Sequence, residues 1–508
     1  MPFTLSASPT GFRSAYGPLE VVLNSPRSPV NTIAGESSIP ISQVKLADAT
    51  DVSIYGSPLE VGDLFVQHAA VPLGTWTAGQ TMKVEGTDID SYNAVWRILK
   101  VVTDKVIVIN ATHVGTATGG LLSKHYENYT VFAEVKMQAT SEKITYELKP
   151  NSAGEFVLNP TDFAQRSFKD IFEIADPSLD FGLIDAETYI TQNWSAYFTE
   201  GYNVPDADGV NVFEYREKLG DTLSIANLIA VNSVQPYHHI EEGTGLPDML
   251  WEDHLEDYTV STEEIRRRWL TFHPSTGSYD SQTARRVAYN DDHWLAFLWS
   301  GATETLRVKV DYTLSNGVTS SLYTDVSVSK KSYLMNVGAD TLGLDPSVVK
   351  YGVSLYFGTT KLIAETWYTV ENSCEPRTVF HALNSFGSID TYGVDGKVNR
   401  STTIKRQTVT KPNIRRTLTT AGDYNRRTYA TTTQRGYSIT TRKEPKAIVR
   451  WLCDEVIESP DVRAQIYNGD VDAYTYVIFG NEKVGMGYRA SRLELEWSYG
   501  VDNRKQRR

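Results

Sequence analysis

Two short clusters of histidines and acids are the first candidates for chemistry in this chain. His238-His239-Ile240-Glu241-Glu242 is followed closely by Glu252-Asp253-His254. Imidazole and carboxylate groups are ligands for divalent metals. Their spacing here matches no recurrent metal motif such as His-Glu-x-x-His. We therefore interpret the stretch as an exposed acidic loop and expect neither a metal nor another cofactor.

Other catalytic patterns are missing from the sequence. It has no Gly-x-Ser-x-Gly elbow, phosphate loop or dinucleotide fingerprint, and Gly485-Met486-Gly487 lacks the third glycine and the strand–helix setting. Cys374 and Cys453 have no Cys-x-x-Cys spacing, and whether they form a bridge stays open. With 62 acidic residues, carboxylate pairs arise by chance and carry no information. We expect a protein that is not an enzyme.

Charge is distributed unevenly along the chain, whose net charge is −13. Residues 401–450 hold twelve Lys and Arg against two acids, whereas residues 240–264 hold nine acids and no Lys or Arg. Such polarity suits docking between copies or onto a charged partner. We hypothesise that the two segments meet across subunits, with these candidate interface residues: Arg415, Arg416, Arg426, Arg427, Glu241, Glu242, Glu252 and Asp253.

The basic segment is also rich in Thr and contains Tyr424, Tyr429 and Tyr437. Interleaved bases and aromatics are a feature of single-stranded nucleic-acid sites. Thr and Tyr equally favour strands, and no helix-turn-helix, zinc-finger or RNP pattern is present. We favour exposed strands or a protein interface, and do not expect nucleic acid as a partner.

Composition and periodicity predict a mainly β, multi-domain chain of β-sandwich (Ig/FN3-like) domains with a small inserted β-barrel and a few short helices. Aromatic residues make up 11% of the 508 residues, and alternating apolar residues at 308–314 and 318–328 flank Asn316-Gly317, a hairpin signal. Buried strands are expected at 105–109 and 474–479, and an alternating strand at 493–499. Helices are expected to begin near Thr161, Ser261 and Ser459.

These signals predict the following boundaries: residues 1–50 plus 123–240 as an N-terminal β-sandwich-like domain, 51–122 as the inserted barrel, 241–264 as an acidic linker, 265–372 as a second sandwich, and 373–508 as a C-terminal β-rich domain with the basic segment 401–450. No apolar run reaches the roughly 18 residues of a membrane helix. The first residues have no basic or apolar signal region. We expect folding in a reducing cytoplasm and no membrane partner.

Several stretches resemble structural proteins of tailed bacteriophages that infect Bacteroidetes, of the crAss-like or flavobacterial type. They are the Ser/Pro-rich opening Ser6–Ser25, the strand Gly154–Leu158 with the helix that follows, Trp269–Pro274, Asp291–Leu298 and Phe380–Asp390. The inserted residues 51–122 are not part of that pattern. The resemblance implies a virion component of the tail or baseplate, present as a homo-oligomeric ring beside other tail or portal-region proteins. Fold analogy of this kind is associational.

Two other classes of function stay open. One is a tail protein that recognises host-surface glycans, for which Trp76, Trp194, Trp251 and Trp294 are candidate contacts, although core packing explains each of them more simply. The other is an enzyme that degrades host polysaccharide. Such enzymes usually have repeats or a deep acidic cleft, and the sequence indicates neither.

Overall fold

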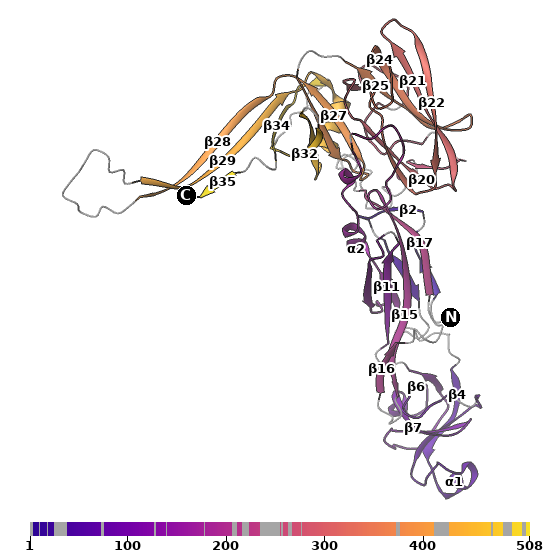
Figure 1. The fold of residues 1–508 in the computed structure, drawn as a ribbon. Coiled ribbons are helices and arrows are strands. Elements are labelled where there is room, and N and C mark those ends of the chain that lie inside the picture. Colours follow the sequence, from indigo (N-terminus) through magenta and orange to yellow (C-terminus); the bar gives the residue numbers. More distant parts are fainter. Residues whose placement is uncertain are drawn as a thin grey trace, which may run out of the picture. The chain divides into compact units, whose positions relative to one another are not determined.

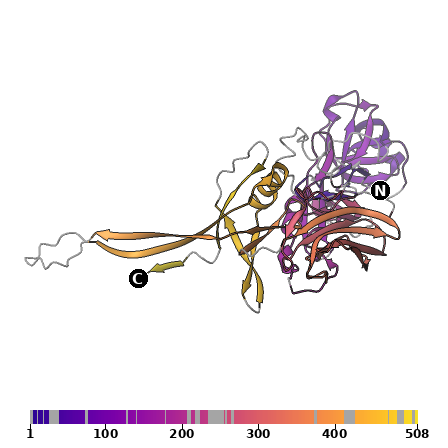
Figure 2. The ribbon, with the colours of Figure 1, turned by 90° about the horizontal axis from the view of Figure 1, so that it is seen from above.

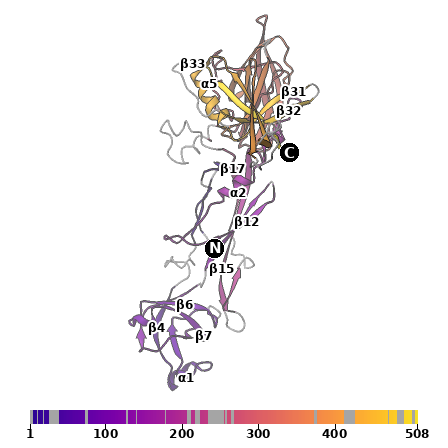
Figure 3. The ribbon, with the colours of Figure 1, turned by 90° about the vertical axis from the view of Figure 1, so that its left-hand side faces the viewer.

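The computed structural model (Figures 1, 2 and 3) describes the following residues: 4–9, 11–17, 19–24, 38–72, 76–125, 129–138, 140–176, 178–205, 211–215, 223–233, 255, 258–262, 267–275, 277–371, 376–410, 426–468, 471–480, 490–499 and 504–507. They form two compact units. Unit 1 comprises Met1–Thr10, Pro18–Phe163 and Asn193–Leu228, and unit 2 comprises Gly11–Gly17, Ala164–Gln192 and Ile229–Arg508. The chain is mainly β with few helices, as the sequence predicts.

Unit 1 contains a closed six-stranded barrel. The ring closes because β10 pairs with β6 on one side and with β4 on the other, and the short β9 adds to β4. The elements are β4 (Ile39–Leu46), α1 (Ala49–Tyr55), β5 (Leu64–His68), β6 (Thr81–Glu85), η1 (Asp90–Tyr92), β7 (Val95–Thr103), β8 (Val106–Ile109), β9 (Ala117–Thr118) and β10 (Leu121–Lys124).

The barrel begins earlier than the sequence-based boundary at residue 51. Strand β4 precedes that boundary, yet it places Ile39, Ile41 and Val44 in the barrel core. Its alternation of buried and exposed residues is that of a half-buried strand. The predicted buried strand at 105–109 is confirmed, since all four residues of β8 are buried.

Apart from the short strand Ile184–Asp185, the remaining described strands before residue 232 form a three-stranded and a six-stranded sheet. Tyr129, next to β11, packs edge to face on Phe156 of β13 with ring centroids 5.9 Å apart. The elements are β1 (Thr4–Ala7), β3 (Val21–Asn24) and β13 (Glu155–Leu158) in one sheet, and β2 (Phe12–Ser14), β11 (Thr130–Met137), β12 (Lys143–Leu148), β15 (Thr191–Pro205), β16 (Asn211–Tyr215) and β17 (Leu223–Val231) in the other.

Unit 2 contains a two-sheet sandwich around one core. Phe297 in that core lies edge to face on Trp269 and stacks on Tyr333. The four-stranded sheet holds β14 (Ile184–Asp185), β23 (Ser332–Asn336), β20 (Trp294–Trp299) and β18 (Thr259–Val260), and the five-stranded sheet holds β19 (Arg285–Val287), β25 (Thr360–Val370), β24 (Val348–Phe357), β21 (Glu304–Leu314) and β22 (Thr319–Val328).

Strand β20 is buried on both faces. Leu295, Phe297 and Trp299 face the sandwich core, while Trp294, Ala296 and Leu298 face a second core that contains Phe386 and Ile389 of the C-terminal region. This double burial explains why β20 is apolar throughout. The C-terminal region is therefore packed directly against the sandwich.

The C-terminal region is an eight-stranded sheet with a short helical segment. The order is β27-β26-β31-β32-β34-β29-β28, with β35 pairing β29. The elements are β26 (Arg377–Leu383), β27 (Ile389–Asp395), β28 (Asn399–Thr410), β29 (Arg426–Thr440), β30 (Glu444–Pro445), α5 (Lys446–Trp451), the π-helix η5 (Leu452–Ile457), β31 (Val462–Asn468), β32 (Val471–Phe479), β33 (Ala490–Ser491), β34 (Glu494–Tyr499) and β35 (Arg504–Arg507). Helix α5 lies beside β33 (Figure 3).

Two helix predictions need correction. The helix expected from Ser459 is wrong, because Val462–Asn468 is strand β31, paired with β26 and β32. Val462, Ala464 and Ile466 fit an alternating pattern as well as a helical one. The helix expected after Thr161 is broken into α2 (Thr161–Arg166) and η2 (Ile171–Glu173). The residues after Ser261 that would form the third helix, 263–266, lie outside the described residues.

The hairpin at 304–328 is confirmed, but its turn differs from a two-residue Asn-Gly turn. Leu314 and Val318 close a three-residue loop, in which Gly317 has a φ of 83° and accommodates the left-handed conformation.

The described part of the predicted linker 241–264 also differs from an exposed connector. Tyr258 and Val260 are buried, and β18 pairs with β20.

Candidate functional site

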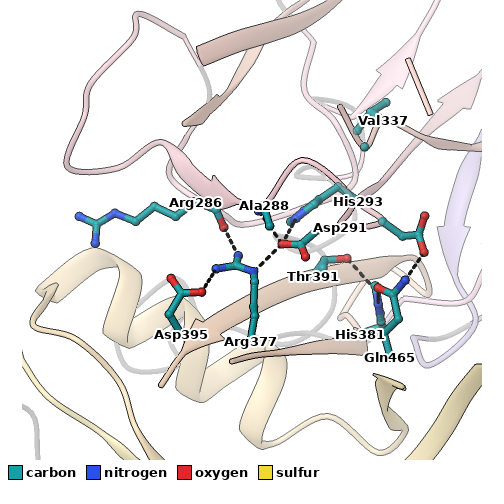
Figure 4. Close-up of polar contacts among 12 residues, drawn as sticks. Arg286, Ala288, Asp291, His293, Val337, Arg377, His381, Thr391, Asp395 and Gln465 are labelled. Atoms are coloured by element: carbon teal, nitrogen blue, oxygen red, sulfur yellow. Dashed lines mark hydrogen bonds and ion pairs between the residues drawn. The ribbon is translucent and has the colours of Figure 1, made fainter. Parts of the chain in front are cut away.

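A desolvated network of charged and polar side chains joins the C-terminal sheet to the sandwich inside unit 2 (Figure 4). On the C-terminal side its residues come from β26, β27, β31 and α5. On the sandwich side they come from β19, β23 and the segments before β19 and β20. They are Thr271, His273, Arg285, Asp291, Asp292, His293, Asn336, Arg377, His381, Asp390, Thr391, Asp395, Trp451 and Gln465. Charges survive such burial only when they are paired and hydrogen-bonded.

Arg377, at the start of β26, is the centre of the first group. Its Nε donates to Asp291 Oδ2 at 2.7 Å, its Nη1 donates to Asp395 Oδ1 at 2.7 Å, and its Nη2 donates to the carbonyl of Arg286 at 2.9 Å. Burial on its own would raise the pKa of Asp291, but contact with His293 and the charge of Arg377 outweigh burial and lower it. Asp291 is therefore an anion held by the junction.

Arg285 and Asp390 form a second pair that is buried almost completely. Arg285 Nη2 donates to Asp390 Oδ1 at 3.0 Å and to Thr271 Oγ1 at 2.8 Å. The Trp451 indole donates to the other carboxylate oxygen at 3.1 Å. Strand β27, the strand β19 and the helix α5 are thus linked through one carboxylate.

His381 anchors the third group, on β26. Gln465 donates its amide to Asp292 at 2.6 Å, so its oxygen accepts from His381 Nε2 at 3.3 Å. Thr391 then donates to His381 Nδ1 at 3.0 Å, and the ring is neutral. Burial lowers the pKa of His381 to about 3 and also lowers the pKa values of His273 and His293. All three histidines are uncharged near neutral pH.

Glu455 of η5 is a buried acid of the opposite kind. Its carboxylate accepts from the Ser385 amide at 2.8 Å and from the Ser385 hydroxyl at 2.7 Å. Burial raises the pKa of Glu455 to about 8 despite these bonds. Glu455 therefore keeps its proton near neutral pH and is buried as an uncharged side chain.

The geometry of this network is better suited to holding the C-terminal sheet against the sandwich than to catalysis. A cavity lined by Arg285, Arg286, Tyr392, Arg442 and Glu444 has a volume of about 20 Å³, which is room for a single water molecule. Within the described ranges, no group of three or more His, Cys, Asp or Glu side chains is placed to hold a metal ion. None of the described helices is long and apolar enough to span a membrane.

The second candidate feature is the outer edge of β28. This strand is last in the order of its sheet and pairs with β29 from Asn399–Ser438 to Thr410–Arg426. Figures 1 and 2 show the two strands as one long ribbon with β35 beside it. By sequence the three strands contain nine Lys and Arg and no acid: Arg400, Lys405, Arg406, Arg426, Arg427, Arg435, Arg504, Lys505 and Arg507.

The predicted interface residues are only partly placed. Arg426 and Arg427 lie on β29, where they pair with Thr410 and Val409. The other six residues lie outside the described residues: Arg415, Arg416, Glu241, Glu242, Glu252 and Asp253. The candidate metal stretch 238–254 likewise lies outside the described residues.

Arg442, a basic residue of the segment 401–450, has partners within its own chain. Arg442 lies 2.6 Å from Glu371 and 3.2 Å from Asp395. That segment is therefore not a uniform docking patch. The tryptophans considered for glycan contact are core residues: Trp76, Trp194 and Trp294 are at most 5% exposed, and Trp251 lies outside the described residues.

Sequence reasoning missed the buried network, although seven of its fourteen residues fall in three of the quoted stretches: 269–274, 291–298 and 380–390. A usable signal was present. Asp291-Asp292-His293 directly precedes a fully apolar strand, and His381 interrupts the apolar run Val379–Leu383. Polar groups embedded in apolar runs indicate buried partners.

Comparison with known proteins assigns no family. No protein-family model matches the chain, and no curated protein matches it. A solved structure of the chicken CNTN1 FN1–FN3 domains is similar over 73% of this chain and 98% of that one, at 9% identity and a TM-score of 0.12. A score this low carries no structural argument.

Replacing Arg377 by Met should destabilise unit 2 by about 3–5 kcal/mol, because Asp291 would be left buried without its arginine partner. Asp395 would also lose Arg377 but would keep its contact with Arg442. The matched control is Arg307→Met, which breaks an exposed pair with Asp325 on β21 and β22 and should cost less than about 1 kcal/mol. Urea unfolding of both variants measures the difference. Equal losses would contradict the role given to Arg377.

Glu455 predicts a pH dependence with a definite sign. The folded chain keeps a proton up to a pKa of about 8, whereas the unfolded carboxyl loses it near 4.5, so this residue's contribution to stability falls as pH rises from 4.5 to 8. In Glu455→Gln that decline should disappear from urea midpoints measured at pH 5, 6, 7 and 8. If the urea midpoint of Glu455→Gln declined with pH as steeply as that of the exposed control Glu147→Gln, the assignment would be refuted.

Proposed function

We propose that this chain is a structural component of a bacteriophage virion, located in the tail or baseplate assembly and acting through contacts between subunits. It folds in the host cytoplasm and becomes part of the particle as a homo-oligomeric ring beside other tail or portal-region proteins. The observation that carries the proposal is the outer edge of β28, along which no strand of the described part of the chain pairs. The resemblance of Ser6–Ser25 and four further stretches to tail structural proteins supports the same class.

An open strand edge twelve residues long needs an explanation. Exposed edges present unpaired N–H and C=O groups that template pairing with another chain, and isolated proteins usually protect them. Strand β28 has no proline, and its described Ile404 is 50% exposed. Its positive charges discourage pairing with an identical strand and favour an acidic partner. Addition of a neighbour's strand is a recurrent mode of assembly.

The buried network supports this role by making unit 2 a rigid support for the edge. Strand β26 is fixed to the sandwich by Arg377, and the neighbouring β31 is fixed by Gln465, which donates to Asp292. The same sheet continues through β32 and β34 to β29 and β28. Recognition of host glycans by the candidate tryptophans has less support, since those described are buried. The mechanism is geometric: a stiff block presents an edge to its neighbours.

The first test is particle composition. Mass spectrometry of purified virions from a phage that encodes this chain should find it in multiple copies per particle, and immunogold labelling should place it at the tail or its junction with the head. A chain abundant in infected cells but absent from purified particles would contradict the proposal.

A second test is self-association of the purified chain. Sedimentation velocity should show oligomers whose size changes between low and high salt, because charge pairs at exposed contacts are screened. Ile404→Glu should weaken association at least about tenfold, since an apolar contact at the edge is replaced by a charge. The control Leu322→Glu, on the edge strand β22 of the sandwich, should leave it unchanged. A monodisperse monomer at every salt concentration would refute the role of β28.

A further inference from the structure

A groove in unit 2 runs along both sides of the segment Phe272–Pro274. On one side it has a volume of about 510 Å³ and is lined by residues of α5 and η5. On the other side it has a volume of about 350 Å³ and extends toward Tyr258 and Ala364. Phe272 and Pro274 line both parts, so the two parts of the groove adjoin along this segment.

The α5 side of the groove is mainly apolar, whereas the other side is more polar. The aromatic residues of the groove are held in place from beneath. Phe272 stacks on Phe386 with ring centroids 4.7 Å apart, and Trp451 lies edge to face on His273 at 4.4 Å. The Trp451 indole is fixed by its bond to the buried Asp390. An occupant therefore meets preformed aromatic walls, which lowers the entropic cost of binding.

The rim of the groove is basic in a chain whose net charge is −13. Among the described residues that line it, the charged ones are Arg267, Arg268, Lys446, Arg450 and the acid Asp454. Arg268 and Lys446 are exposed, and neither has an ion-pair or hydrogen-bond partner in the described part of the chain. The groove is thus complementary to an acidic segment with apolar side chains.

We propose that this groove binds the acidic segment 240–254 of a second copy of this chain, which ends before Leu255, a residue buried in its own chain. That segment has five acids and no Lys or Arg, and its Asp248-Met-Leu-Trp-Glu-Asp253 places an apolar triplet between acids. The triplet matches the apolar α5 side of the groove and the flanking acids match the basic rim. Groove and segment are different surfaces, so the contact is heterologous and can close a ring. The inference rests on the proposed function and assigns it one interface.

Complementation between two variants tests the proposal. Arg268→Glu/Lys446→Glu reverses the rim, and Trp251→Ala/Glu252→Gln/Asp253→Asn disables the segment. Each variant alone should associate at least tenfold more weakly than the unaltered chain in sedimentation velocity at low salt. An equimolar mixture should regain association as heterodimers, because each partner retains one half of the contact. The control Lys105→Glu/Lys149→Glu, which makes the same charge change at exposed sites elsewhere, should associate normally.

A mixture that remains unassociated, while the unaltered chain forms oligomers, would overturn this inference and leave the proposed function standing. Binding of a fluorescent peptide of residues 240–254 gives a second measure, and its affinity should fall at least tenfold for the rim variant. Preferential capture of an anionic oligosaccharide or oligonucleotide over this peptide would also overturn it. Circular dichroism confirms that each variant is folded.

Discussion

Two buried arginines hold the C-terminal sheet of unit 2 in one arrangement against the sandwich. Arg377 and Arg285 each meet an aspartate in surroundings from which water is excluded, with Arg285 and Asp390 no more than 2% exposed. A buried ion pair is not a strong source of stability against an apolar alternative, but breaking it is costly. Any shift of β26 or β27 against the sandwich would separate these groups. The pairs therefore act on specificity: they select one docking position.

That selected position determines what the surface presents. Strand β27 carries Asp390 and β26 carries Arg377, and both belong to the sheet whose last member is β28. Trp451 joins the same carboxylate to α5, which lines the groove. One set of desolvated contacts thus supports both the basic strands β28, β29 and β35 and the basic groove. For an assembly protein this coupling matters, because several contacts per subunit must hold a consistent geometry for a ring to close.

The sequence was sufficient for the class of the fold and for strands with a clear period. Val308 to Leu314 and Leu493 to Tyr499 alternate because one face is buried, and this signal is local. It was insufficient where two periods fit one apolar set, as at Val462–Asn468, which forms a strand because β26 and β32 lie on either side. The barrel boundary at Ile39 depends on ring closure with β10, a contact between distant residues. The buried network was missed for the same reason, since Asp291 and Arg377 are 86 positions apart.

Electron cryo-microscopy of the particle, at a resolution that allows β28 to be traced, is the most direct test of the view that this molecule is a building block. The account predicts repeated copies around an axis, with the outer edge of β28 hydrogen-bonded to a neighbouring chain. Copies whose β28 edge faces solvent, with no protein bound along it, would contradict the account.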